Sequence, residues 1–430
     1  MRQVASKEPL PELREFLLPF SNYFQRSEGR QDLERYTTGL LSDIPRKNSQ
    51  TIASSVPETN SQRLQEFLTR IKWDEASLNR YRIEKMKDEV RLGDGVLIFD
   101  DTGFVKQGDC SVGVARQYCP PLGKVANCQV AVTCVYADPA VHWPFDVRLY
   151  LPKQWVQDTQ RRQKAGVPQK VSFKTKPQIA LEILDEALEI SIPHEAVVAD
   201  ADYGKDSCFL EGLEKRNEPY VVAVPCDFQV KFEGCIQRAD DVLKALPRRM
   251  WKTISWREGA NGKLRRKFVA LRVFRTVKGQ PKQEGWLIGE RPARGQKGEW
   301  RYYFSNLPED TPLKRLVELA HRRWAIERFH EDAKELLGWE DYQGRLWRGF
   351  HRNCVIVMLA YSFLVWQEWR QRQRKPRTRG RPRNPFSPRR DPRRQSLAQI
   401  HRQVVDALFE MVVEQRLREI LTHEPRSSPS

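Results

Sequence analysis

Apolar residues recur every three or four positions in the first 92 residues of the chain, a spacing that predicts short amphipathic helices. Pro45 and Pro57 fall between the periodic stretches as breaks. The expected helices span residues 10–23, 31–41, 48–55, 62–71 and 74–90. We therefore expect residues 1–92 to form a helical N-terminal domain.

From Gly93 the pattern changes to short apolar runs that are typical of buried strands. In chain order the sequence predicts strands at 96–99, 130–136 and 145–151, a helix at 177–188, a strand at 196–199, a helix at 208–215 and a strand at 220–224. This order is that of a ribonuclease-H-like α/β fold, whose mixed sheet brings the first and fourth strands side by side. By this analogy residues 93–224 form the larger part of an α/β domain.

The following segment, residues 225–297, departs from that order and reads as a β-rich insertion with glycine-rich turns. Residues 298–366 are expected to rejoin the α/β domain, with a strand at 301–305, an amphipathic helix at 311–337 and a mostly apolar helix at 353–369. A last helix is expected at 396–421, within a C-terminal segment of residues 396–430. Its apolar side is a candidate packing or dimer surface.

Acidic residues follow two of the predicted strands. The first run ends in Asp100 and Asp101, and the strand at 196–199 is followed by Asp200 and Asp202. Active sites of open α/β sheets gather at the carboxyl ends of strands. Successive strand residues point to opposite faces, so only one of Asp100 and Asp101 can reach a shared site. For the second acid we prefer Asp200 to Asp202, because Asp200 directly ends the apolar run.

The helix at 311–337 supplies a third carboxylate. Arg323, Glu327 and Lys334 are spaced at i, i+4 and i+11, which places them on one helix face. An Arg–Glu pair on a solvated surface is the alternative interpretation of this spacing. Three such carboxylates could hold two divalent metal ions about 4 Å apart for in-line attack on a phosphodiester. Oxygen ligands favour magnesium or manganese.

Three segments resemble, in order, the signatures of DDE transposases of the insertion-sequence families IS4 and IS701. They are Asp100-Asp101-Thr102-Gly103-Phe104, Asp200-Ala201-Asp202-Tyr203-Gly204, and Arg323-Trp324-Ala325-Ile326-Glu327 with Lys334. Residues 111–118, 123–129 and 149–152 resemble the IS701 family in particular. The chain has Ala320 where the third signature usually has tyrosine. The resemblance covers most of residues 30–350.

The resemblance implies a DNA transposase, a metal-dependent endonuclease and strand transferase that cuts the ends of its insertion sequence and joins them to target DNA. It implies that Asp100, Asp200 and Glu327 are catalytic and bind two Mg²⁺ ions, for which Mn²⁺ can substitute. Asp100 is preferred to Asp101 because related transposases show Asp, any residue, then Thr or Ser, and Thr102 fits that spacing. Arg323 and Lys334 are expected to neutralise phosphate near the cut.

Two other functions remain open. Another ribonuclease-H-like DNA nuclease, such as a resolvase, would share the fold, but such enzymes are usually small and lack the 127-residue separation between Asp200 and Glu327. A DNA-binding regulator derived from a transposase would have lost catalysis, although all three candidate acids are present.

The charge of the chain favours a polyanionic partner. The sequence holds 74 Lys and Arg against 56 Asp and Glu, a net charge of +18, which suits double-stranded DNA at the transposon ends and in the target. Residues 370–394 alone carry +11, and we expect residues 367–395 to be a disordered basic linker. Within it Arg379-Gly380-Arg381-Pro382 resembles an AT-hook core. Generic phosphate binding is the alternative role of these arginines.

Two further segments are candidates for DNA contact. In the insertion, Trp251 and Trp256 lie among arginines and could stack on an unpaired base, or they could form the core of a small β subdomain. The N-terminal helices could place one helix in the major groove of a transposon end, or they could only cap the catalytic domain.

The remaining composition narrows the class of protein. Eight cysteines without a Cys-x-x-Cys pair indicate reduced thiols, and seven scattered histidines indicate no histidine-based metal site. No apolar run approaches the roughly 20 residues that cross a bilayer. We therefore expect a soluble protein without a membrane partner, located in the cytoplasm and associated with the bacterial nucleoid when bound to DNA. We also expect a homodimer in the active complex.

Overall fold

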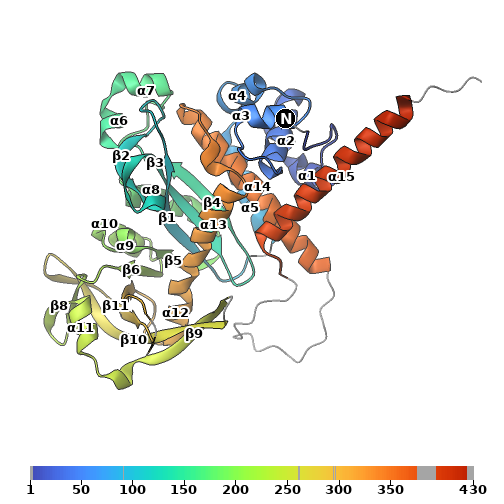
Figure 1. Cartoon of the computed structure of the whole chain (residues 1–430). Coiled ribbons are helices and arrows are strands. Elements are labelled where there is room, and N and C mark those ends of the chain that lie inside the picture. The colour runs from blue at the N-terminus through green and yellow to red at the C-terminus, as the bar shows by residue number, and fades with distance from the viewer. Residues whose placement is uncertain are drawn as a thin grey trace, which may run out of the picture.

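A mixed β-sheet runs through the molecule (Figure 1). The computed structural model describes residues 3–90, 92–259, 262–293, 295, 297–374 and 394–423, and of these the side chains of residues 258, 259, 263 and 423 are left aside. Within these ranges twelve strands join in the order β2-β3-β1-β5-β6-β12-β11-β10-β7-β8, with β4 on β3 and β9 on β10. The strands are β1 (Gly95–Val105), β2 (Ala115–Cys119), β3 (Lys124–Ala137), β4 (His142–Leu149), β5 (His194–Ala199), β6 (Tyr220–Val224), β7 (Gln229–Phe232), β8 (Cys235–Arg238), β9 (Lys252–Gly259), β10 (Gly262–Val277), β11 (Gln280–Arg291) and β12 (Arg301–Ser305).

Strand β1 lies at the centre of the first half of the sheet. It pairs antiparallel with β3 and parallel with β5, so the first and fourth predicted strands are side by side, as expected. The β1–β5 ladder ends at the pair Phe99–Ala199, whereas β1 continues to Val105. Asp100 and Asp200 are therefore the next residues after the last pair on the two strands.

The segment expected as an insertion continues this sheet. Strand β12 pairs with β6 on one side, where Phe304 faces Val222, and with β11 on the other, where Phe304 faces Leu287. Strands β10, β7 and β8 follow outward from β11. Residues 225–297 are thus rich in strands, as predicted, and share one hydrogen-bonded sheet with the strands on either side of them.

Helices cover both faces of the sheet. Helix α8 (Lys176–Glu189) packs near β3 on one face, with α10 (Ser207–Lys215) against α8. On the other face α13 (Trp324–Glu335) crosses β1, β3 and β4, and α14 (Trp347–Arg374) packs on β4. The remaining helices are α6 (Lys153–Gln157), α7 (Thr159–Ala165), α9 (Ala201–Gly204), α11 (Ala239–Ala245), α12 (Leu313–Ala320) and α15 (Leu397–His423).

The N-terminal region is helical, as predicted, and lies at the opposite end of the molecule from β8–β11 (Figure 1). Its proline breaks fall between helices. Asn48 caps the third helix by accepting hydrogen bonds from the backbone N–H groups of Gln50 and Thr51. The elements are α1 (Pro11–Leu17), the 3₁₀ turn η1 (Leu18–Tyr23), α2 (Ser27–Leu41), α3 (Ser49–Ser55), α4 (Ser61–Thr69) and α5 (Glu75–Glu89).

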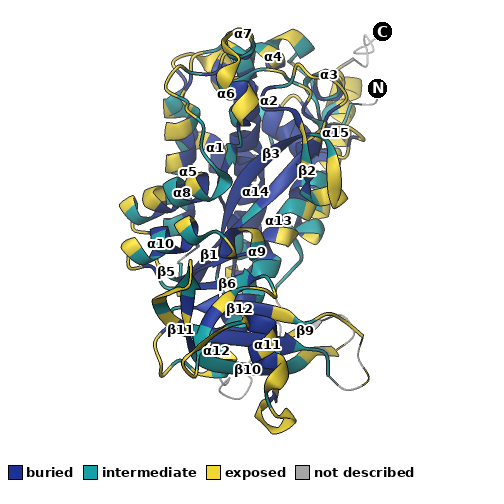
Figure 2. Ribbon diagram, turned by 90° about the vertical axis from the view of Figure 1, so that its left-hand side faces the viewer, coloured by how far each residue is buried: buried dark blue, intermediate teal, exposed yellow. Residues whose placement is uncertain are grey.

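Helix α14 is the buried axis of this end of the molecule, and it contacts α2, α4, α5 and α15 (Figure 2). By length and composition it could cross a membrane, but 94% of its most apolar window is buried inside the protein.

Helix α14 also extends to Arg374, beyond the expected end at residue 369. The reason is tertiary contact: Arg370 stacks on Trp366 and pairs with Glu15, and the Arg372 side chain, 6% exposed, donates to the carbonyl of Ala140. These two arginines are anchored to the body rather than part of the expected disordered linker.

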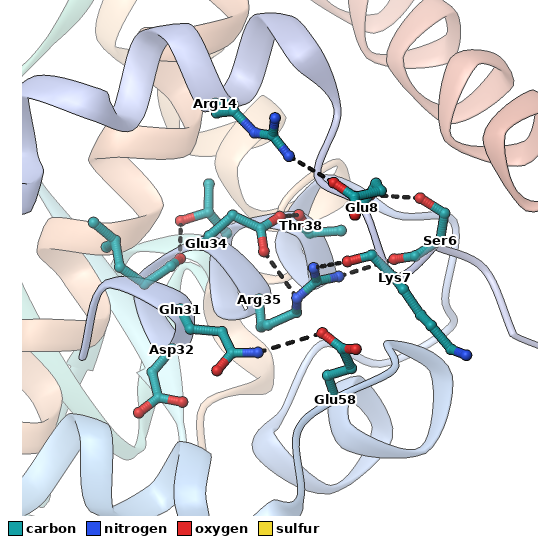
Figure 3. Close-up of polar contacts among 12 residues, drawn as sticks. Ser6, Lys7, Glu8, Arg14, Gln31, Asp32, Glu34, Arg35, Thr38 and Glu58 are labelled. Carbon is teal, nitrogen blue, oxygen red and sulfur yellow. Dashed lines mark hydrogen bonds and ion pairs between the residues drawn. The ribbon is translucent and has the colours of Figure 1, made fainter. Parts of the chain in front are cut away.

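The extended segment before α1 is fixed to α2 by Arg35 (Figure 3). The Arg35 guanidinium donates to the carbonyl oxygens of Ser6, at 2.9 Å, and of Lys7, while its Nε lies 2.9 Å from the Glu34 carboxylate. The backbone N–H of Lys7 in turn donates to Gln415 of α15 at 2.7 Å. This polar cluster therefore ties the N-terminal segment to both α2 and the C-terminal helix.

Helix α15 packs on α14 and α2, and its buried apolar residues reach only as far as Val412. Ile400, Val404, Leu408 and Val412 are buried, whereas Leu417 is 54% exposed. The apolar side expected for this helix thus divides into a packed part and an exposed part. Residues 375–393, which include Arg379 and Arg381, lie outside the described residues.

Candidate active site

The free edge of β1 beyond the β5 ladder carries the first candidate carboxylate. Asp100 continues the alternation of β1, and its side chain is 14% exposed. One carboxylate oxygen accepts a hydrogen bond from the backbone N–H of Asp101 at 2.8 Å, and the other lies 2.7 Å from Nη1 of Arg323. Asp100 therefore faces α13.

Asp200 occupies the N-cap of α9. Its Oδ1 accepts hydrogen bonds from the backbone N–H groups of Asp202, at 2.9 Å, and Tyr203, at 3.2 Å. Asp202 instead turns outward, with its side chain 60% exposed and 2.6 Å from Lys205. The preference for Asp200 over Asp202 stays a prediction, and this difference in orientation is consistent with it.

The third carboxylate comes from a segment that was expected to be one helix. Instead α12 ends at Ala320, the 3₁₀ turn η4 (His321–Arg323) follows, and α13 begins at Trp324. The stacking of Trp256 on His321 accompanies this turn, with ring centroids 3.9 Å apart. The turn places Arg323 at the N-cap of α13, where its guanidinium contacts both Asp100 and Glu327.

Arg323 thus pairs with Asp100 and Glu327, and the charge of Asp200 also acts on it. We refer to Asp100, Asp200 and Glu327 as the acidic cluster. Burial and the charge of Asp200 raise the pKa of Asp100 to about 7, although Arg323 opposes this rise. Burial also raises the pKa of Asp200. For Arg323, burial lowers the pKa, but the carboxylates of Asp100, Glu327 and Asp200 outweigh burial and raise it. The cluster therefore holds more negative charge than Arg323 neutralises.

Asp101 lies on the other face of β1, only 8% exposed. Its Oδ2 is 2.6 Å from Nζ of Lys176 on α8, and its Oδ1 accepts a hydrogen bond from the hydroxyl of Tyr203 at 2.7 Å. Burial raises the pKa of Asp101, and Lys176 counteracts that rise. Both oxygens have partners on this face, which points away from Arg323.

Two further residues of α13, Lys334 and His330, contact β1 and β3. Nζ of Lys334 donates to the carbonyl of Gly103 at 3.1 Å, so this residue lies beside β1 rather than against Glu327. Burial lowers the pKa of Lys334. Nε2 of His330 lies 2.8 Å from the hydroxyl of Thr133, which donates to the carbonyl of Asp100 at 2.8 Å. Since Thr133 has one hydroxyl proton, His330 must carry its proton on Nε2 and donate.

The sequence interpretation treated the histidines as scattered and missed His330. Burial lowers the pKa of this side chain to about 3, so it is neutral at physiological pH. The signal was its position three residues after Glu327, on a neighbouring part of the same helix.

The two candidate tryptophans lie within the β-rich half of the sheet. Trp251 is 3% exposed and packs edge-on against Trp300 at 5.1 Å. Trp256 is covered by His321, and the neighbouring Arg257 lies over the ring of Trp324 at 3.9 Å. In this structure Trp251 is a core residue, and Trp256 fixes the β9–β10 hairpin to the turn that carries Arg323. Their expected role in stacking on a base stays a prediction.

The donor set of the acidic cluster fits a hard divalent cation, because it consists of carboxylate oxygens near uncompensated negative charge. Within the described ranges, no three His, Cys, Asp or Glu side chains are already gathered at metal-binding distances. Glu327, 55% exposed, is turned to Arg323. A cation held by Asp100 and Glu327 would therefore replace Arg323 as the partner of these two carboxylates.

Comparison with known proteins identifies the family. Residues 19–239 match the family described as DDE superfamily endonuclease, and residues 174–363 match the transposase DDE domain. The chain is also 28% identical, over 314 residues, to a probable transposase for insertion sequence element IS701 from Microchaete diplosiphon, covering 71% of this chain and 74% of the relative. The ranges of the two family matches include Asp100, Asp200 and Glu327. The chain therefore belongs to the DDE superfamily of endonucleases and is a DNA transposase with a dependence on divalent metal.

Proposed function

We propose that this transposase cuts the ends of its own insertion sequence and joins them to target DNA at the acidic cluster. The observation that carries this proposal is that Arg323 pairs with a carboxylate of β1 and a carboxylate of α13 at the free edge of β1, while the charge of Asp200, in the turn after β5, acts on both Asp100 and Arg323. The pairing order β4-β3-β1-β5-β6, with β1, β5 and β6 parallel, supports a ribonuclease-H-like catalytic core.

Asp100, Asp200 and Glu327 would hold two Mg²⁺ ions, or Mn²⁺ in their place. When bound, these ions supply the activation of the attacking oxygen and the stabilisation of the leaving 3′ oxygen in an in-line displacement. The carboxylates themselves would fix the position of the ions, and through them that of the reacting phosphate, relative to β1. Burial first, and then repulsion from Asp200, disfavour the charged form of Asp100 without a cation, and both raise its pKa.

Arg323 would exchange partners when DNA binds. Without DNA its guanidinium neutralises Asp100 and Glu327. A cation at the acidic cluster would release it, and a guanidinium in this position can donate two parallel hydrogen bonds to a phosphate. Lys334 lies beside Gly103, three residues farther along the same strand, and would neutralise a neighbouring phosphate of the same DNA strand.

The rest of the chain supplies basic surface for double-stranded DNA. The N-terminal helices, the β9–β10 hairpin with Arg257 and Trp256, and the arginines of residues 370–394, including Arg379 and Arg381, are the proposed contacts. The net charge of +18 supports this assignment. Such a protein works where bacterial DNA lies, in the cytoplasm and at the nucleoid, and two copies are proposed to hold the two ends.

A strand-transfer assay tests the function. The substrate is a DNA fragment that carries the inverted repeats flanking this reading frame, with a supercoiled plasmid as target. We expect cleaved ends and joined products in Mg²⁺, and bound but uncut ends for Asp100→Asn, Asp200→Asn and Glu327→Gln. Wild-type protein that binds the ends and never cuts them in Mg²⁺ or Mn²⁺ would instead identify a DNA-binding regulator.

A further inference from the structure

Asp101 and its partners form a closed group behind the acidic cluster. The Asp101 side chain is 8% exposed, and each of its oxygens has a partner, the Tyr203 hydroxyl at 2.7 Å and the Lys176 ammonium at 2.6 Å. Tyr203 is 2% exposed. The reaction proposed above assigns these three residues no part, yet Asp101 and Tyr203 are buried polar groups within three residues of Asp100 and Asp200.

Tyr203 is bonded to both acidic segments at once. Its backbone N–H donates to Asp200, and its hydroxyl donates to Asp101. The turn that carries it is also held from behind, because a Cβ on Gly204 would lie only 1.9 Å from the carbonyl oxygen of Ala223 on β6. The position of the Asp200 turn is thus fixed by β6 on one side and by Asp101 on the other.

The location of these bonds gives them a consequence for metal binding. The main-chain ladder between β1 and β5 ends at Phe99 and Ala199, and the Tyr203–Asp101 bond joins the two segments beyond that end. A divalent cation between Asp100 and Asp200 needs their carboxylates at a fixed separation, and groups that orient metal ligands change metal affinity by about 10–100-fold.

We propose that Asp101 and Tyr203 are positioning residues, which clamp the Asp200 turn to the Asp100 strand and so preorganise the divalent cation site. Lys176 completes the clamp, because its charge neutralises Asp101 and keeps a further negative charge from adding to the acidic cluster. This inference rests on the proposed function, since it assumes that Asp100 and Asp200 bind the cation.

Tyr203→Phe tests the clamp, since it removes one hydroxyl and little volume. The matched control is Tyr220→Phe on β6, where another buried tyrosine donates to a carboxylate, Glu214, at 2.9 Å. Mn²⁺ affinity is measured on the DNA-free protein by the electron paramagnetic resonance signal of free Mn²⁺. We expect affinity to fall about tenfold in Tyr203→Phe, with no change in Tyr220→Phe, while both variants lose similar thermal stability.

Cleavage measured against Mn²⁺ concentration gives an independent readout. We expect Tyr203→Phe to need about tenfold more Mn²⁺ for half-maximal cleavage and to recover the wild-type rate at saturation, because the carboxylates themselves remain. Wild-type Mn²⁺ affinity in Tyr203→Phe, or an equal loss in both tyrosine variants, would overturn the clamp.

Asp200→Asn separates failure of the clamp from failure of the proposed function. If Asp200→Asn loses Mn²⁺ binding and Tyr203→Phe does not, the clamp alone is wrong. If Asp200→Asn binds Mn²⁺ as the wild-type protein does, the assignment of the acidic cluster is wrong and the clamp falls with it.

Discussion

Two neighbouring aspartates have different partners on the two faces of β1. On the α13 face, Asp100 and Glu327 share Arg323 and the charge of Asp200 also acts on it, so one cation faces the charge of three carboxylates. On the α8 and α9 face, Asp101 has a lysine and a tyrosine hydroxyl for itself. On the α13 face the negative charge of the carboxylates exceeds the one positive charge of Arg323, so this face can bind a metal ion. On the other face Lys176 already neutralises Asp101. Residue type alone therefore does not identify a metal ligand, whereas the local balance of charge does.

The largest expected effect compares Asp100→Asn with Asp101→Asn. Asp100→Asn should lower the cleavage rate by on the order of a thousandfold at any metal concentration, because it removes a group from the reacting centre. Asp101→Asn should cost only about tenfold, and high Mn²⁺ should restore the rate, because it acts through the position of Asp200. Cleavage of labelled ends across a metal titration measures both. The comparison is contradicted if Asp101→Asn shows no cleavage at any metal concentration while Asp100→Asn still cleaves the ends.

Arg323→Gln should reduce strand transfer by on the order of a hundredfold, a size typical of losing one positioned charge at a reacting centre. Asp100 and Glu327 would also lose their counterion, so added Mg²⁺ should raise the melting temperature of this variant more than that of the wild-type protein. Cleavage of a pre-nicked end and melting with and without Mg²⁺ provide the two readouts.

Arg328→Gln is the control for Arg323→Gln, since Arg328 pairs with Glu331 and Asp332 on the same helix. Normal transfer by Arg323→Gln would leave this arginine as a surface partner only.

Lys334→Gln should have a smaller effect, about tenfold on strand transfer, because Lys334 lies beside Gly103 rather than in contact with the acidic cluster. We expect Lys334→Gln to leave the free energy of unfolding nearly unchanged, because the ammonium that it removes is partly buried and costs desolvation energy. The ratio of the Arg323→Gln and Lys334→Gln rates, measured on the same pre-nicked end, gives the order in which the two charges matter at the reacting phosphate. A larger loss in Lys334→Gln than in Arg323→Gln would reverse that order.

The smallest expected effect concerns the pH dependence of stability through His330. Burial depresses the folded pKa of His330 to about 3, below the ordinary value of 6.5. The unfolded chain therefore binds the extra proton first, and stability is lost as pH falls below about 6.5, by up to about 1.4 kcal/mol per pH unit. Urea unfolding at pH 7.5, 6.0 and 5.0 should show a shallower loss in His330→Gln than in the wild-type protein.

His194 provides the opposite control for that measurement. Burial lowers the pKa of His194, but its hydrogen bonds to Glu218 and to the carbonyl of Ile192, together with the charge of Glu218, outweigh burial and raise it. This residue therefore contributes stability at low pH that is lost as pH rises. His194→Gln should therefore make the loss of stability below pH 6.5 steeper. Parallel slopes in the two histidine variants would contradict the assignment of a neutral His330.

Much of the fold was predictable because apolar runs and helical spacing report directly on burial. The runs at 220–224 and 301–305 became β6 and β12 with the expected ends, and the first and fourth strands paired. The break at η4 was not predictable, because it accompanies the stacking of Trp256, 65 residues earlier, on His321. The end of α14 was missed for a similar reason, since its arginines are held by Glu15 and Ala140.

The candidate site was predictable as a set of acidic residues but not as a balance of charges. The order of the motifs indicated Asp100, Asp200 and Glu327, and alternation along β1 indicated that Asp100 and Asp101 face opposite sides. The preference for Asp100 rests on the spacing to Thr102 and stays a prediction. The partners of each carboxylate depend on distant residues such as Lys176 and Tyr203, which no local pattern specifies. His330 and Thr133 likewise meet only because α13 crosses β1 and β3.

The position of a bound Mn²⁺ ion tests the central claim most directly. Anomalous diffraction from crystals of the protein soaked in Mn²⁺ should show the ion coordinated by the carboxylates of Asp100 and Asp200 on the α13 face of β1, with the Arg323 guanidinium displaced from Asp100. The Asp101 carboxylate should keep its bonds to Lys176 and Tyr203. An ion bound to Asp101 or Asp202 instead, with Arg323 still on Asp100, would contradict the account.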